Sequence, residues 1–211
     1  MRDPSALPSS ERMPIAWGVS SKALGTASES GDLHAVVPGA QNILVAAIDG
    51  LGHGREAALA ARTAASVLKK RGDEPLTQLM QRCHEELRHT RGVVQSMALF
   101  EPRTATMTWL GVGNVEGVLF RAEGCSGTRR DSLILRGGVV GYQIPPLRPA
   151  KLHVAAGDVL VFATDGVRSG FSACYPENPD AQQAADAILA EFGKETDDAM
   201  VLVVRYLGQP E

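Results

Sequence analysis

The stretch from residue 42 to residue 57 constrains the fold of this chain more than any other part of it. An unbroken apolar run over residues 43–48 ends on the carboxylate of Asp49, and glycines follow at positions 50, 52 and 54. A short run of this kind, closed by glycines, predicts a buried strand. The Ala-, Leu-, Arg- and Lys-rich segment 55–70 then predicts a helix. A carboxylate followed by bare backbone suits a hard cation, because glycine lets a carbonyl oxygen or a phosphate approach closely.

The same stretch allows two other interpretations. Asp49 could cap the following helix, since Asp is a favoured N-cap residue. The pattern Gly50-x-Gly52-x-Gly54 also resembles a dinucleotide-binding loop, because it follows a strand and opens a helix. That fingerprint, however, needs its third glycine three positions after the second, and here it comes two positions after. The Asp49 carboxylate would also point negative charge at the pyrophosphate.

Length and composition are typical of one globular domain, with 211 residues, 44% hydrophobic and 21% charged. The net charge of -3 predicts no nucleic-acid partner. No apolar run approaches the roughly 18 residues that a membrane helix needs, so we expect no membrane partner. Segment 1–14 lacks the apolar core of a secretion signal. We therefore expect a cytoplasmic monomer with a flexible tail over 1–14, a single domain over 15–207 and a C-terminal tail over 208–211.

The order of the predicted elements separates this chain from the parallel, doubly wound folds. Two consecutive helices, over 55–70 and 74–89, come before most of the strands, whereas a doubly wound fold alternates strands with helices. Strands are predicted over 15–20, 35–38, 43–48, 93–101, 104–112, 115–121, 132–136, 151–154, 158–163 and 200–206, and a third helix over 180–192. We expect segment 93–121 to form an antiparallel meander and segment 151–163 to form a hairpin.

Four acidic residues lie at the ends of predicted strands: Asp32, Asp49, Asp165 and Asp197. Carboxylates gathered at one edge of a packed sheet would repel one another and titrate abnormally unless a cation lay between them. Oxygen ligands without His or Cys favour Mg²⁺ or Mn²⁺ over zinc. Two such ions, roughly 3.5 to 4 Å apart, can activate a bridging water and bind phosphate oxygens.

The ordered set of these motifs resembles a known family. Gly31-Asp32, Asp49-Gly50-x-Gly52-x-Gly54, Thr164-Asp165-Gly166 and Asp197-Asp198 occur in that order. The set is similar to the metal-dependent serine/threonine phosphatases of the protein phosphatase 2C superfamily, in the bacterial branch that includes the sporulation stage II phosphatase. Within that branch the chain resembles the stressosome feedback phosphatases of the general stress pathway. The resemblance covers about residues 15–207.

This resemblance implies a fold, a metal site and a reaction. The implied fold is α+β, a four-layer α/β/β/α sandwich of two mainly antiparallel sheets flanked by helices. Two Mn²⁺ or Mg²⁺ ions are implied, with Asp49 bridging both. Asp32 and the carbonyl oxygen of Gly50 would serve one ion, and Asp165 and Asp197 the other. Asp198 would contact the metal ligands without binding the metal itself. Because Asp197 and Asp198 are adjacent, it stays open which of the two binds the ion. Asp49 and Asp165 are the implied catalytic residues.

The implied reaction is hydrolysis of phosphoserine or phosphothreonine in a protein, with stressosome or general stress pathway regulators as substrates in negative feedback. The sequence departs from the eukaryotic branch at two residues, one that can protonate the leaving group and one that binds the phosphate. Leu51 stands where that branch has a histidine directly after Asp-Gly, and His53 is two positions further on. The phosphate-binding arginine near the N-terminus has no clear match. A catalytically weak or inactive binding module of the same fold is the alternative.

Overall fold

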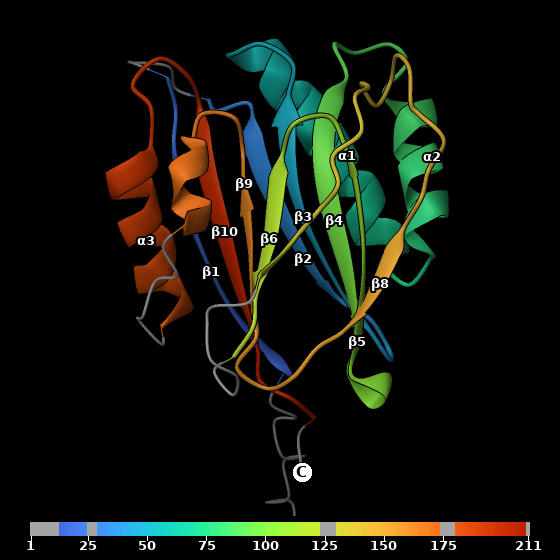
Figure 1. Ribbon diagram of the computed structural model, residues 1–211. Coiled ribbons are helices and arrows are strands. Elements are labelled where there is room, and N and C mark those ends of the chain that lie inside the picture. Colours follow the sequence, from blue (N-terminus) through green and yellow to red (C-terminus); the bar gives the residue numbers. More distant parts are fainter. Residues whose placement is uncertain (1–12, 25–28, 123–129, 174–179, 210–211) are drawn as a thin grey trace, which may run out of the picture.

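The computed structural model describes residues 13–24, 29–122, 130–173 and 180–209. Two five-stranded antiparallel sheets lie face to face, and helices cover both outer faces (Figure 1). Sheet I runs in the order β1 (Ile15–Lys22), β10 (Ala199–Tyr206), β9 (Val159–Ala163), β6 (Glu116–Phe120) and β7 (Arg130–Ser132). Sheet II runs in the order β2 (Asp32–Pro38), β3 (Ile43–Gly50), β4 (Val93–Glu101), β5 (Thr106–Val112) and β8 (Ala150–His153).

The helices form the two outer layers. Helices α1 (Arg55–Arg71) and α2 (Leu76–Glu86) pack on sheet II, and α3 (Ala181–Phe192) packs on sheet I. Two short 3₁₀ turns, η1 (Pro102–Thr104) and η2 (Ser169–Ala173), complete the described elements. The expected four-layer α/β/β/α sandwich is confirmed. None of the helices in the described residues is long and apolar enough to span a bilayer. Apart from residues 13–14 and 208–209, the two expected tails lie outside the described residues.

Three apolar clusters join the four layers. The cluster between the sheets includes Val45 of β3 and Phe162 of β9, whereas Leu44 and Ala46 of β3 face α1 and α2. A strand buried on both faces reads as a continuous apolar run, which is why residues 43–48 do not alternate. The third cluster lies between sheet I and α3. Because β3 and β9 are each buried on both faces, the positions of their ends are fixed. The residues that follow these two strands are therefore also held in place.

Helix α1 packs tightly against the end of β3. Its buried face is almost entirely alanine, so its axis can approach the sheet closely. A Cβ atom built on Gly50 would collide with the backbone of Ala57 in the first turn of the helix. Glycine at position 50 therefore permits the close approach of the first turn of α1 to the end of β3.

The expected meander over 93–121 is wrong in its third strand. Strands β4 and β5 pair as expected, but β6 crosses into sheet I and pairs with β7 and β9. In β6, Leu119 faces the core between the sheets while Val118 and Phe120 face the layer of α3. A strand buried on both faces needs a central position, and in sheet I it has one. The strand expected over 132–136 is also displaced, because β7 covers Arg130–Ser132.

The expected hairpin over 151–163 is wrong as well. Strand β8 pairs with β5 at the edge of sheet II, whereas β9 lies between β10 and β6 in sheet I. The connecting loop is held by Asp158, which is 2% exposed. Its carboxylate accepts hydrogen bonds from Arg121 Nη1 at 3.0 Å and from the backbone N–H of Ala122 at 2.8 Å. These bonds fix the loop to the end of β6 and direct the chain from one sheet to the other.

Candidate metal centre

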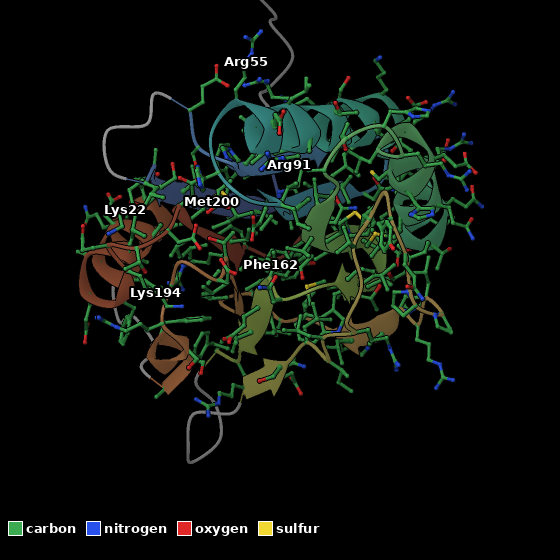
Figure 2. The ribbon with its side chains drawn as sticks, turned by 90° about the horizontal axis from the view of Figure 1, so that it is seen from above. Lys22, Arg55, Arg91, Phe162, Lys194 and Met200 are labelled. Atoms are coloured by element: carbon green, nitrogen blue, oxygen red, sulfur yellow. The ribbon has the colours of Figure 1, made fainter. Side chains whose placement is uncertain are left out.

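The four predicted carboxylates come together at one end of the sandwich, the upper end in Figure 1. Asp32 begins β2 and Asp49 lies next to the end of β3, and the antiparallel register places these two residues directly opposite each other. Asp165 follows the end of β9, and Asp197 precedes the start of β10. Figure 2 looks down on this end, with Phe162 and Met200 of the core between the sheets near its middle.

Burial and crowding raise the pKa values of the first two carboxyl groups. The pKa of Asp32 is raised to about 7, chiefly by burial and further by the charges of Asp198, Asp165 and Asp197. The pKa of Asp49 is raised to about 8, first by burial and then by the charges of Asp32, Asp165, Asp197 and Asp198. Electrostatic repulsion thus links five carboxylates from four separate chain segments, which is a charge distribution that a divalent cation would relieve.

Thr164 connects the two sheets at this end. Its Oγ1 donates a hydrogen bond to Asp32 Oδ2 at 2.7 Å and accepts one from the backbone N–H of Met200 at 2.8 Å. Thr164 is buried, and so is Asp32. The bond to the carboxylate lowers the pKa of Asp32 and opposes the effect of burial. In the sequence analysis Thr164 appeared only as part of the Thr164-Asp165-Gly166 motif. The hydroxyl next to Asp-Gly was the one local sign that this residue could contact a carboxylate.

The adjacent aspartates have different surroundings. Asp198 is 4% exposed, and its carboxylate accepts hydrogen bonds from the backbone N–H groups of Leu24 at 2.7 Å and Gly31 at 2.6 Å. Asp197 is half-buried, and its Oδ1 accepts the N–H of Asp198 at 2.9 Å. The Asp198 side chain is therefore committed to holding the chain around Gly31. Asp197 keeps the freer carboxylate of the two.

Asp165 is the exposed member of the set. Asn114 Nδ2 donates to its Oδ2 at 2.9 Å, and Lys194 Nζ donates to its backbone carbonyl at 2.6 Å. Asn114 belongs to the glycine-containing turn between β5 and β6. Neither partner was assigned from the sequence, because each contact joins segments at least 29 positions apart. His53 lies exposed in the loop before α1.

The backbone around Gly50 lies close to that of Gly31. The backbone N–H of Gly50 donates to the carbonyl of Gly31 at 3.0 Å. A Cβ atom built on Gly31 would lie 3.2 Å from the carbonyl oxygen of Gly50 and 3.2 Å from Asp198 Oδ2. Glycine at position 31 therefore leaves the space beside that carbonyl free of a side chain.

Comparison with known families now decides the family. The sequence profile of stage II sporulation protein E (SpoIIE) matches residues 39–207. This chain belongs to the SpoIIE family. A search of curated protein sequences gives no significant match.

Solved structures share the fold of this SpoIIE-family chain. One solved structure is 29% identical to this chain, with a TM-score of 0.82, and the match covers 90% of this chain and 99% of that one. It is described as the bacterial stressosome, a modular system that has been adapted to control secondary messenger signalling. RsbX in complex with magnesium is 16% identical with a TM-score of 0.80, covering 90% and 94%. The PP2C phosphatase domain of SpoIIE from Bacillus subtilis, with a fragment of its regulatory domain, is 19% identical with a TM-score of 0.74, covering 92% and 64%. The solved SpoIIE domain is described as a PP2C phosphatase domain, and this SpoIIE-family chain shares its fold.

The donor set in this SpoIIE-family chain fits a hard divalent cation, because it offers carboxylates and a glycine carbonyl. Within the described residues, no three carboxylate, His or Cys side chains are grouped so that they could hold an ion as they stand. Two carboxylates instead accept bonds from Thr164 and Asn114. Metal binding by these residues would therefore require side-chain rotations, for which neutralising the crowded charge would supply the driving force.

The raised pKa values predict how stability depends on pH in the metal-free protein. The folded state keeps protons on Asp32 and Asp49 that the unfolded chain releases near pH 3.8. The free energy of unfolding should therefore fall as the pH rises from about 4 to about 8, by an amount on the order of a few kcal/mol. Urea unfolding at pH 5 and pH 8 with a chelator present measures this difference. Adding Mn²⁺ at pH 8 should restore the lost stability, and equal stability at both pH values would contradict the prediction.

Proposed function

We propose that this chain is a metal-dependent protein serine/threonine phosphatase that hydrolyses phosphoserine or phosphothreonine. The observation that carries the proposal is the meeting of five carboxylates, from four segments, at one end of a PP2C-type fold, where burial and neighbouring charges raise the pKa values of Asp32 and Asp49. Such a cluster is costly for a protein without a cation. When bound, two Mn²⁺ or Mg²⁺ ions would supply an activated water and neutralise charge on the phosphoryl oxygens.

Each residue of the cluster has a proposed part. Asp49 would bridge both ions, the Gly50 carbonyl and Asp32 would hold one, and Asp165 and Asp197 would hold the other. Thr164 would orient the Asp32 carboxylate through its 2.7 Å hydrogen bond. A metal ligand held by such an outer partner keeps its orientation, and loss of an outer partner typically costs about 10- to 100-fold in metal affinity or activity.

The proposed substrates are phosphorylated regulators of a stressosome or general stress pathway, with dephosphorylation acting as negative feedback. Support comes from the 29% identity and the near-complete coverage of the chain described as part of a bacterial stressosome system. The exposed position of Asp165 also favours a folded protein substrate, because this carboxylate lies at the surface rather than in a closed cavity.

Release of phosphate from a phosphoserine protein tests the proposal directly. With Mn²⁺ we expect turnover, and with excess chelator we expect none. A matched control is Asp186→Asn, because Asp186 is an exposed residue of α3 on an outer layer of the sandwich. Turnover that is equal with and without chelator would rule out the metal-dependent reaction.

The alternative is an inactive PP2C-type binding module. One observation favours it: no three possible ligand side chains in the described ranges form a ready metal site. Calorimetric titration with Mn²⁺ distinguishes the two functions. Binding of about two ions per chain supports the phosphatase, and no measurable heat of binding supports the binding module.

A further inference from the structure

Arg91 lies in a fixed turn at the same end of the molecule as the carboxylates. Thr90 Oγ1 donates to the carbonyl of Leu87 at 2.8 Å and accepts the N–H of Gly92 at 3.0 Å. The carbonyl of Gly92 in turn accepts the N–H of Leu51, two residues after Asp49, at 3.1 Å. Gly92 has a φ of 80°, a conformation that suits glycine. The backbone on either side of Arg91 is thereby held against the loop that follows Asp49.

The guanidinium of Arg91 lies over Gly52. A Cβ atom built on Gly52 would be 2.7 Å from Arg91 Nη1, and Gly52 has a φ of 87°. Glycine at this position thus leaves the space that the guanidinium occupies. Figure 2 shows Arg91 between α1 and the sheets, whereas Arg55 lies at the outer margin of the molecule. The side chain of Arg91 therefore lies at the inner side of the loop that follows the proposed metal-bridging aspartate.

The partner of this guanidinium is exchangeable. Arg91 forms an ion pair with Glu56, and the two side chains are 52% and 66% exposed. An ion pair this exposed contributes little to the stability of the fold. Glu56 lies in the first turn of α1, where the helix dipole favours a carboxylate even without a cation beside it. Breaking the ion pair therefore costs little on either side.

Two other cationic side chains at this end have different partners. Lys22 pairs with Glu195 at 2.8 Å on the α3 side of the molecule. Lys194 donates to the backbone carbonyl of Asp165 at 2.6 Å. Arg91, in contrast, presents a planar fork of N–H donors that matches the oxygens of a phosphoryl group.

We propose that Arg91 is the phosphate-binding residue of this site, which exchanges Glu56 for the phosphoryl oxygens when a phosphoserine arrives. The inference rests on the proposed phosphatase function and adds a specific group to it. Arg91 comes from the turn before β4, far in sequence from the N-terminal strand. Glu56 holds the guanidinium in place until the dianionic phosphoryl group, with its higher charge, displaces it.

Calorimetric binding of inorganic phosphate to the full chain in Mn²⁺ tests this role without relying on turnover. Arg91→Ala should weaken phosphate binding about tenfold or more, the usual scale for losing a charged hydrogen-bonding group. Arg91→Lys should recover part of it, since Lys keeps the charge and loses the fork. The affinity for Mn²⁺ should stay unchanged in both variants. Arg55→Ala, which removes the outward-facing neighbour, is the matched control and should bind phosphate normally.

Glu56→Gln gives the decisive comparison, because its expected effect has the opposite sign. Freeing the guanidinium should tighten phosphate binding a few-fold, and the gain should vanish when Arg91→Ala is also present. If Arg91→Ala binds phosphate as the parent does, or if both single variants weaken it equally, the role is overturned. If phosphate binding depends on Arg91 but no phosphoprotein is hydrolysed, Arg91 binds as proposed and the phosphatase function fails.

Discussion

Asp49→Asn should nearly abolish phosphatase turnover while making the metal-free protein more stable above pH 7. Asp49 is proposed to bridge both ions, so its loss should exceed the roughly 10- to 100-fold cost of losing an outer partner. At the same time the amide cannot ionise. Burial and four neighbouring carboxylates raise the pKa of Asp49 to about 8, so removing its charge relieves repulsion. We expect a gain on the order of 2 kcal/mol in the free energy of unfolding at pH 8.

Opposite changes in activity and stability separate this result from simple misfolding. Phosphate release in Mn²⁺ gives the first quantity, and urea unfolding with a chelator at pH 5 and pH 8 gives the second. The variant should also show a weaker fall in stability between these pH values than the parent. Asp186→Asn, on the exposed face of α3, should leave both measurements unchanged. A variant that loses stability at pH 8 would contradict the assignment of Asp49 as a carboxylate under electrostatic repulsion.

Local sequence predicted the strand ends of the site because each has a strong local cause. The run 43–48 is buried on both faces and ends on Asp49, and the run 159–163 does the same before Asp165. Apolar character, β-branched residues and the following Asp-Gly pairs are all visible without any tertiary contact. The two strands belong to different sheets, and the face-to-face packing of these sheets brings their acidic ends to the same end of the sandwich. The acidic strand ends were therefore within reach of sequence reasoning, whereas their meeting depends on how the sheets pack.

Sheet membership was not predictable in the same way. Strands β5 and β6 are separated only by a short turn that contains Gly113 and Asn114, which locally resembles a hairpin turn. What sends β6 into sheet I is burial on both faces, together with the occupation of the edge of β5 by β8. Strand β8 is far from β5 in the sequence, although the two strands pair. A single sequence does not show which strands compete for the same edge.

The roles of neighbouring polar residues were also beyond local patterns. Asp197 and Asp198 are equivalent in sequence, and their difference depends on which side chain points at the backbone of Leu24 and Gly31. Thr164 and Arg91 likewise gain their meaning from partners on other elements, Asp32 and Glu56. Sequence reasoning found the carboxylates that carry the charge and missed the groups that orient them.

Asp198→Ala should destabilise the fold strongly, whereas Asp197→Ala should not. The Asp198 carboxylate is 4% exposed and accepts two backbone N–H groups, at 2.7 Å from Leu24 and 2.6 Å from Gly31. Hydrogen bonds to a charged group contribute about 1.5–3 kcal/mol each, and an unsatisfied buried donor adds a penalty. We expect a loss of about 3 kcal/mol or more, a large fraction of the roughly 5–15 kcal/mol that holds a domain folded.

Relief of charge repulsion does not offset this loss. Removing the charge of Asp198 relieves repulsion at Asp32 and Asp49, but burial is the largest cause of both raised pKa values, so this relief returns less than the two lost hydrogen bonds cost. Thermal unfolding in chelator should show a fall of about 6–12 °C for Asp198→Ala. For Asp197→Ala the melting temperature should barely change, because this side chain is half-buried and, among the residues that the structure describes, its hydrogen bond is to the next residue. Its proposed effect is weaker Mn²⁺ binding by calorimetry. A stable Asp198→Ala protein that has lost Mn²⁺ binding would reverse the roles of the two aspartates.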